Sequence, residues 1–553
     1  MGIGMAMLRY KLSMSGKCHG FATFSPGLTV ILPANFMLAG VAEMASFSPT
    51  VAVVRYGYGL APGQVLNRNS DDLLVQLADA PLSDSYFPIG GAFAARQRSS
   101  DLADRIIATS AGKNGGELDR DGRRLIQQQA EQSFQRDSMA RVMQAVFSSY
   151  GFHERLASFW LDHFSVNARK ALPMRLITPL YEVEAIRPHL AGSFRDLLQA
   201  AVLHPAMLIY LDQNRSAGPE STAAEKNKRG LNENLGRELL ELHTLGAGSG
   251  YTQADVRSAA LVLTGMTVDD RNEMLFRPRM AQPGQIKVLG VSYGGRKRTA
   301  DDCLDMLNDL ALRPETAVHV CRKLAAHFIA DEAPPEIVAA MVDEWKASKG
   351  HLLKVYAVML NHPRAWADPG RKMKLPFDYV VSGLRAFGIT QKNWQGKMSP
   401  NGDDEVGQAA APAVTSDTNA MQQGGDQATM EKPNDDMNAM AKQTAKPKPK
   451  QSLARTLTLA SLRRMGQPVW QPPSPAGFEE GVASWLSPSQ MSERILWARK
   501  ASSSLGGDME PKMFLATAMA DLARDDTIRV VSQAPSRVSG MTLALSSPEF
   551  NRR

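Results

Sequence analysis

Apolar residues recur every three or four positions along most of this chain. The pattern is clear in residues 51–60, 119–147, 152–159 and 453–465, and few segments show the strict alternation of a half-buried strand. A spacing of three to four places apolar side chains on one face of an α-helix. The exception is the glycine-rich stretch 275–293, where we expect a loop or a small β-hairpin. The sequence therefore predicts an all-α fold, a multi-helix array with short loops.

Composition sets one internal segment apart from the rest. Residues 392–451 are rich in Gln, Asp, Asn, Ala, Lys, Pro and Met and contain few aromatic or β-branched residues. Such a segment buries too little apolar surface to offset the entropy lost on ordering. We therefore expect a disordered low-complexity insertion there. The flanking segments, 47–391 and 452–553, are expected to be the main part and the C-terminal part of one helical domain.

The first 46 residues have two interpretations. Arg9, Lys11 and Lys17 precede the apolar stretch 28–42, an arrangement typical of a secretory signal. Alternatively, the true start is Met44 and the upstream residues are a mis-assigned extension. The first interpretation predicts a periplasmic or secreted protein, and the second a cytoplasmic one. Elsewhere no run of 18 apolar residues occurs, so we expect no membrane span.

Charge and cysteine content exclude some classes of function. The net charge of +7 is mild for 553 residues, and no basic run with interleaved aromatic residues is present. We therefore expect no nucleic-acid binding. The three cysteines, Cys18, Cys303 and Cys321, show no CxxC spacing, which argues against a disulfide framework and against a structural zinc site.

The richest polar pattern lies in residues 232–246, which we expect to form one helix ended by Gly246. Asn234, Glu238 and Glu241 share one face of this helix at positions i, i+4 and i+7, and His243 is nearby. Two carboxylates one turn apart can bind a divalent cation or perform acid–base chemistry. The alternative is an ordinary ladder of surface ion pairs.

A second element, residues 160–164, places an aromatic residue and a histidine on one helix face. Trp160 and His163 are three positions apart, and His163 becomes a ligand candidate only if it meets Glu238 or Glu241 in space. Otherwise it is a packing residue. The candidate catalytic residues are Glu238, Glu241, His163 and His243, and the candidate binding residues are Trp160, Asn232, Asn234 and Arg237.

Several runs together resemble a known family. Trp160-Leu-Asp-His-Phe164, Asn232 to Gly246 and Gly250-Tyr-Thr-Gln-Ala-Asp255 are similar to successive elements of the uncharacterised bacterial family called domain of unknown function 1800. The likeness covers about residues 47–390 and 452–505. Where many relatives carry His-Asp/Glu-Pro-Gly, this chain reads Ala281-Gln-Pro-Gly284.

The resemblance implies two classes of function. Genes of this family often lie beside genes of the domain of unknown function 1501 family, whose members resemble alkaline-phosphatase-like enzymes. This suggests an accessory or scaffold protein that works with a phosphatase-like partner. The alternative is a hydrolase-type enzyme with a carboxylate and histidine site, with or without a divalent metal.

Overall fold

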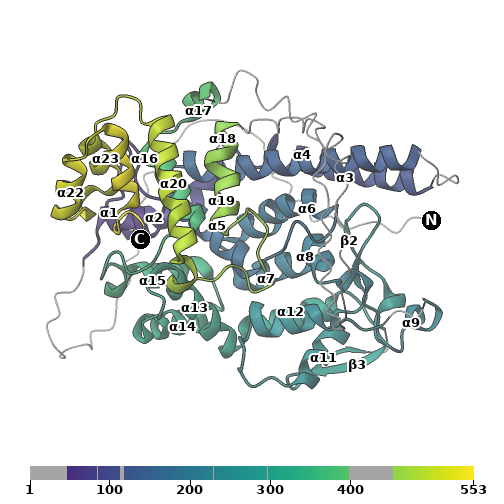
Figure 1. Ribbon diagram of the computed structural model, residues 1–553. Helices are drawn as coiled ribbons and strands as arrows, with labels where there is room; N and C mark the ends of the chain where they lie inside the picture. Colours follow the sequence, from purple (N-terminus) through teal and green to yellow (C-terminus); the bar gives the residue numbers. More distant parts are fainter. Residues whose placement is uncertain (1–45, 84, 112–117, 228–229, 296, 398–451) are drawn as a thin grey trace, which may run out of the picture. The chain divides into compact units, whose positions relative to one another are not determined.

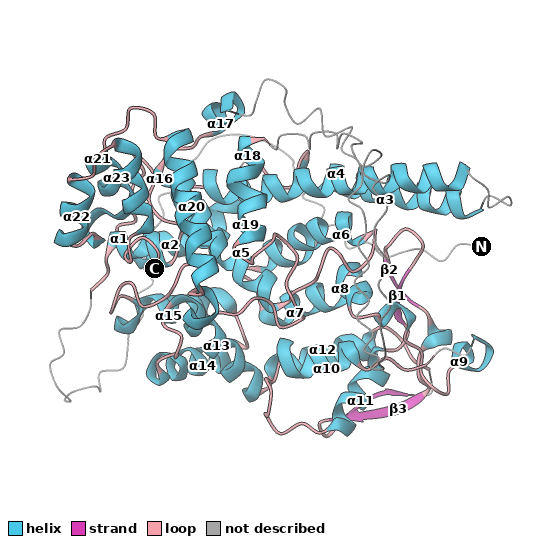
Figure 2. Cartoon of the chain, viewed as in Figure 1, coloured by secondary structure: helices cyan, strands magenta, loops and turns pink. Residues whose placement is uncertain are grey.

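Helices make up most of the chain, as the three-to-four spacing predicts (Figures 1 and 2). The structure is a computed structural model that describes residues 46–553, except for residues 84, 112–117, 228–229, 296 and 398–451. The predicted all-α fold is confirmed. Of the predicted extension and insertion, residues 1–45 and 398–451 lie outside the described residues. The first residues of the predicted insertion belong to a short helix, α17.

The helices before the strands carry the predicted site residues. Their bounds are α1 Pro49–Arg55, α2 Ser70–Asp79, η1 Ala80–Leu82, α3 Gly91–Ala111, α4 Leu118–Phe147, α5 Gly151–His163, α6 Met174–Tyr181, η2 Glu182–Ile186, η3 Arg187–His189, α7 Phe194–Leu203, α8 Pro205–Tyr210, η4 Gln213–Arg215, α9 Thr222–Asn227, α10 Asn234–Glu238, η5 Leu239–His243 and α11 Gln253–Leu263.

Of the remaining helices, η6 lies between the two strand pairs and the others follow both pairs. Their bounds are η6 Pro278–Met280, α12 Asp301–Leu312, α13 Pro314–Phe328, α14 Pro335–Ser348, α15 Leu352–Asn361, η7 Pro363–Ala365, α16 Pro376–Ala386, α17 Gln391–Lys397, α18 Leu453–Arg455, η10 Thr456–Ala460, α19 Ser461–Arg464, η11 Val482–Trp485, α20 Pro488–Leu505, α21 Pro511–Met519, η12 Ala520–Leu522, α22 Asp525–Ser532 and α23 Arg537–Ser546.

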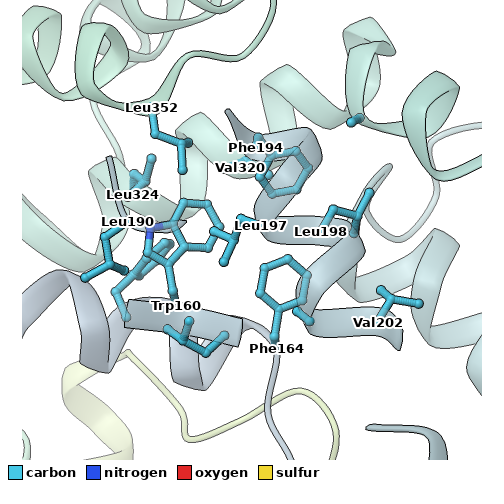
Figure 3. Packing of buried hydrophobic residues seen from close by; sticks show 14 of the residues in the cluster. Trp160, Phe164, Leu190, Phe194, Leu197, Leu198, Val202, Val320, Leu324 and Leu352 are labelled. Atoms are coloured by element: carbon cyan, nitrogen blue, oxygen red, sulfur yellow. The ribbon is translucent and has the colours of Figure 1, made fainter. Parts of the chain in front are cut away.

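The largest core is built around α5. Trp160 and Phe164 pack against α7, which contributes Phe194 and Leu197, and against α13, which contributes Leu324 (Figure 3). The Trp160 indole is fully buried, and its Nε1 donates a hydrogen bond to the hydroxyl of Tyr356 at 2.7 Å. Trp160, a predicted binding residue, is therefore a core residue whose only polar atom is satisfied inside the protein.

A second core joins the two sides of the insertion. It contains residues 142–146 of α4, most of α16, and buried side chains of α18 to α23. The Tyr379 hydroxyl donates to the backbone oxygens of Arg494 and Leu545, at 3.1 and 3.2 Å. α16 therefore packs with the helices that follow the insertion, which supports the expectation that the C-terminal part belongs to the same domain.

The described strands form two small antiparallel pairs. β3 (Gly284–Val288) pairs with β4 (Val291–Gly295), which confirms the predicted hairpin near 275–293. Its two turn residues, Leu289 and Gly290, both have positive φ, 48° and 91°, as a tight two-residue hairpin requires. β1 (Met266–Val268) pairs with β2 (Met274–Phe276) and was not predicted.

The helix predicted from residues 232–246 is shorter than expected and changes its pitch. It begins at Asn234, and α10 passes directly into the π-helical turn η5, which ends at His243. Gly246 follows with a φ of +90°, so the predicted glycine stop is confirmed. Thr252 and Asp255 form a capping box that opens α11.

Within the described part of the chain, no helix is both long enough and apolar enough to cross a membrane.

Candidate functional site

The structure brings two of the predicted catalytic residues together. The ring centroids of His163 and His243 are 6.4 Å apart, and the Nε2 of His163 lies 3.2 Å from the backbone oxygen of His243. A third ring, that of His319 on α13, lies 6.0 Å from His163, and its Nε2 is 3.0 Å from the backbone oxygen of Leu242. The three histidines join the end of α5, the η5 turn and α13.

These histidines are held uncharged. Burial lowers the pKa of His243 to about 3 and that of His319 to about 4, and it also lowers the pKa of His163. The positive charge of Lys323 lowers all three further. His163 is 1% exposed and His243 is fully buried. Among the described residues, neither ring nitrogen of His243 has a hydrogen-bond partner.

The predicted carboxylates lie in a different environment. Glu238 and Glu241 are half-buried, and the structure records no ion pair for either of them among the residues it describes. Burial, followed by the charge of Glu241, raises the pKa of Glu238. Neither is recorded in a hydrogen bond with His163 or His243. Their role as a site stays a prediction.

The predicted ion-pair ladder is present in part. Arg237 lies 3.8 Å from Glu233, and its guanidinium donates to the side-chain oxygen of Gln253 at 2.9 Å. The Asn232 side chain accepts the backbone N–H of Asn234 at 2.8 Å, at the start of the helix. These contacts tie α10 to α11 and to its own first turn, so Arg237 and Asn232 have structural partners.

No metal site is recognisable in the described ranges. No group of three or more His, Cys, Asp or Glu side chains there is placed to hold a metal ion. Cys303 and Cys321 are buried and free.

A small, partly open cavity lies on the other side of α5 and is lined by charged side chains from distant segments. It has a volume of about 90 Å³ and lies between α5, α13, the start of α16 and the segment 467–480. Its ionisable lining residues are Arg141, Asp162, His327, Asp378 and Glu480. We call it the Asp162 cavity.

Backbone and side-chain hydrogen bonds hold the segment 467–480 across α5. The backbone N–H of Phe478 donates to Oδ1 of Asp162 at 2.8 Å, and Ser165 donates to the oxygens of Ser474 and Pro475 at 3.1 and 3.0 Å. Gly477 has a φ of +87°, and a Cβ there would lie 2.6 Å from the Asp162 carboxylate. Glycine is thus required for the chain to approach Asp162 so closely.

Asp162 is the carboxyl group of this cavity that titrates near neutrality. Burial raises its pKa to about 7, although the N–H of Phe478 and the charge of Lys323 act in the opposite direction. The negative charge of Glu480 adds to the increase. Among the described residues, no cation lies within ion-pair distance of Asp162, so the hydrogen bond from Phe478 and the charge of Lys323 offset the cost of its desolvation only in part.

The other two carboxylates of the cavity are paired with cations. Asp378 lies 2.7 Å from Arg155 and 2.6 Å from Arg553. Glu480 pairs with Nδ1 of His327 and lies 3.4 Å from Nζ of Lys372. Burial raises the pKa of Glu480, but the contact with His327, which includes a hydrogen bond, and the charge of Lys372 outweigh it and hold the pKa at about 2.

Both ring nitrogens of His327 have hydrogen-bond partners. Its Nε2 lies 3.2 Å from an amino group of Arg155, which can only donate, so this nitrogen accepts. Its Nδ1 then carries the proton and donates to Glu480. Burial lowers the pKa of His327, while Glu480 raises it. His327 therefore positions Glu480 and Arg155 and is not a free base.

Arg141 offers a donor to the cavity. Its Nε lies 3.2 Å from Glu182, and Nη2 donates to Ser158 at 2.7 Å. Nη1 is buried and has no hydrogen-bond partner among the described residues. The guanidinium also lies 4.6 Å from the centre of the Phe377 ring. A fixed guanidinium with one free N–H is suited to bind an oxygen that carries negative charge.

The residues of the Asp162 cavity were not among the predicted site residues. Asp162 stands inside the run Trp160 to Phe164, and an acid among large apolar residues was a signal that could have identified it. No such local signal marks Asp378, Glu480 or Arg553, because the residues that surround them come from distant parts of the sequence and meet only in the folded chain.

Fold and cavity together describe a helical protein with a small cavity lined by charged side chains. The family model described as "Protein of unknown function (DUF1800)" matches residues 51–552. The chain belongs to this family, which confirms the resemblance inferred from the sequence. No curated protein and no solved structure matches the chain.

Proposed function

We propose that this protein is a hydrolase-type enzyme whose acid–base site is the Asp162 cavity. The observation that carries the proposal is a small cavity in which one carboxyl group, Asp162, has no cation partner among the described residues. The same cavity contains a guanidinium, that of Arg141, with a buried N–H that has no acceptor there. A free base and a free oxyanion donor in one cavity are the two groups that ester hydrolysis needs.

The roles follow from the geometry and the charge. Asp162, as a carboxylate, accepts a proton from a water molecule, and the water oxygen attacks the substrate ester. The negative charge that develops on the ester oxygen is stabilised by Nη1 of Arg141. The departing alkoxide takes the proton from Asp162, which regenerates the carboxylate. A pKa near 7 suits both transfers at neutral pH.

The size of the cavity limits the substrate. A volume of about 90 Å³ holds a few water molecules or one small acyl or phosphoryl group. We therefore expect the reacting end of the substrate to be small and polar.

Steady-state assays test the proposal. Purified protein is assayed with p-nitrophenyl acetate and p-nitrophenyl phosphate between pH 5 and 9, alongside Asp162→Asn and, as a matched control, Glu238→Gln. We expect turnover of one ester to rise with pH through about 7, to fall at least 100-fold in Asp162→Asn, and to be unchanged in Glu238→Gln. Turnover that Asp162→Asn retains, or no turnover of either ester, contradicts the proposal.

The second candidate function is an accessory or scaffold protein that works with a phosphatase-like partner of the domain of unknown function 1501 family. It is supported by large apolar side chains exposed on the C-terminal helices: Leu496 on α20 is 59% exposed, Met513 on α21 67% and Val530 on α22 48%. Exposed apolar residues mark interaction surfaces when they form one patch.

Co-expression tests this candidate. The chain and a partner of that family are co-purified, with Leu496→Asp and Met513→Asp tested separately. Loss of the partner in these variants, with retention in Leu125→Asp on the distant helix α4, supports the accessory function. Leu125 is 53% exposed and is the matched control. Retention of the partner in every variant, or no co-purification, contradicts it.

A further inference from the structure

A second, larger hollow lies along the C-terminal half of α4. It has a volume of about 300 Å³ and lies between α4, the residues before α3, α17 and the α18–η10 helix (Figure 1). Its floor is one face of α4, formed by Met139, Ala140, Met143 and Phe147. We call it the α4 groove. Its size is at the lower end of the range for small-molecule sites.

The aromatic lining of the α4 groove contains two polar groups without partners. Trp394 of α17 is 4% exposed, and its Nε1 is buried with no acceptor among the described residues. The hydroxyl of Tyr86 is likewise buried without a described partner, and its ring lies 4.7 Å from that of Phe147. A buried indole N–H or phenol usually has a hydrogen-bond partner, and leaving it without one is unfavourable. Two such groups in one groove point to a ligand that supplies an acceptor.

The charge of the groove indicates what kind of acceptor. Arg136 and Arg455 line it, and no aspartate or glutamate does. Neither guanidinium is recorded in an ion pair among the described residues, whereas Arg141, Arg155 and Arg187 all have carboxylate partners. A groove with two such arginines and no acid attracts an anion.

We propose that the α4 groove binds an amphipathic carboxylate, a compound with one acidic group on an unbranched apolar chain. The apolar chain lies along Met139, Met143 and Phe147, and the flexible side chains of the two methionines suit an unbranched chain. The carboxylate accepts from Trp394 and Tyr86 and faces Arg136 and Arg455. This site is separate from the Asp162 cavity, with which it shares no lining residue.

Calorimetric titration of the full chain tests the proposal. The probes are decanoate, butyrate with the same head and a shorter chain, and decanol with the same chain and no charge. We expect decanoate to bind at one site per chain and to bind at least tenfold more tightly than butyrate or decanol. No saturable binding of decanoate, or equal binding of decanol, overturns the proposal.

Variants identify the site. The double variant Arg136→Gln with Arg455→Gln is expected to weaken decanoate at least tenfold, and Trp394→Phe, which keeps the ring and removes the N–H, about threefold. The matched control is Arg279→Gln with Arg529→Gln, which removes the same charge from two exposed positions outside the groove. Equal weakening by both double variants, or none by either, places the binding elsewhere and overturns the proposal. Far-UV circular dichroism and the unfolding midpoint confirm that each variant is folded.

Discussion

Two regions of the molecule bring acidic side chains together, and their surroundings differ. Glu238 and Glu241 lie one turn apart on a single helix, half-buried and without a described ion pair. Asp162, Asp378 and Glu480 come from three segments far apart in sequence and line one small cavity. Helical spacing sets which side chains are neighbours along one element. Only the packing of several elements sets how far a carboxylate is desolvated and which cation it meets.

The largest expected change in the free energy of unfolding comes from Asp378, the acid of the cavity that pairs with two arginines. Asp378→Ala leaves Arg155 and Arg553 buried without their carboxylate, and both are nearly inaccessible. We expect a loss of about 3–5 kcal/mol in the free energy of unfolding, or a failure to fold. Urea denaturation measures it. Glu233→Ala in the exposed pairs of α10 is expected to cost less than about 1 kcal/mol, and similar losses in both variants would remove the distinction between the two regions.

The next largest effect is the pH dependence of stability that Asp162, the acid without an ion pair, is expected to produce. Because the folded pKa of Asp162 is raised to about 7 from an ordinary value near 4, the folded state binds this proton more tightly than the unfolded state. The carboxylate therefore destabilises the fold progressively as pH rises from about 4 to 7. We expect Asp162→Asn to gain about 2–4 kcal/mol relative to wild type over that interval. A difference in unfolding free energy that stays constant with pH would show that the carboxyl is not desolvated.

A smaller effect is expected from the buried histidines near the end of α5. It has the opposite pH dependence, because their contribution to stability is lost as the pH falls. The pKa of His243 is lowered to about 3, so its contribution to stability is present above its ordinary pKa near 6.5 and is lost as pH falls below that value. We expect His243→Gln to be about 1–3 kcal/mol less sensitive to acid between pH 6.5 and 4. Acid titrations followed by circular dichroism measure this. Equal acid sensitivity of variant and wild type would show that His243 becomes protonated without unfolding.

The smallest changes in the free energy of unfolding are expected from the two carboxylates carried by α10 and η5. Glu238→Gln and Glu241→Gln are each expected to change the free energy of unfolding by less than about 0.5 kcal/mol, because neither carboxylate has a described ion pair to lose. Metal analysis of the Glu238→Ala, Glu241→Ala double variant beside wild type tests the metal alternative. A divalent ion bound by the wild type and lost from this variant would move the candidate site to this helix.

Much of the architecture was predictable because it follows from local pattern. The three-to-four period gave the helices, Gly290 marked the hairpin turn, and Thr252 with Asp255 marked the start of α11. Of the candidate site residues named from the sequence, His163 and His243 lie near each other, with ring centroids 6.4 Å apart, and their role stays a prediction. The β1–β2 pair was missed because strands of three residues carry too little alternation to detect.

The Asp162 cavity was not predictable in the same way. Its acid lies one position before the predicted His163, on the side of α5 that faces the segment 467–480. That segment follows the insertion, and no periodicity relates residue 478 to residue 162. The predicted Trp160 is likewise a core residue because Tyr356, almost 200 positions later, receives its N–H. The desolvation of a side chain and the identity of its hydrogen-bond or ion-pair partner depend on such neighbours from distant parts of the sequence.

The pKa of the Asp162 carboxyl tests the central claim most directly. In protein labelled with ¹³C at the aspartate side-chain carboxyl, the resonance of Asp162 is the one that disappears in Asp162→Asn, and its chemical shift is followed from pH 3 to 9. The structure predicts a midpoint of about 7. A midpoint near 4, that of an ordinary solvated aspartate, would contradict the account of a desolvated acid without an ion pair.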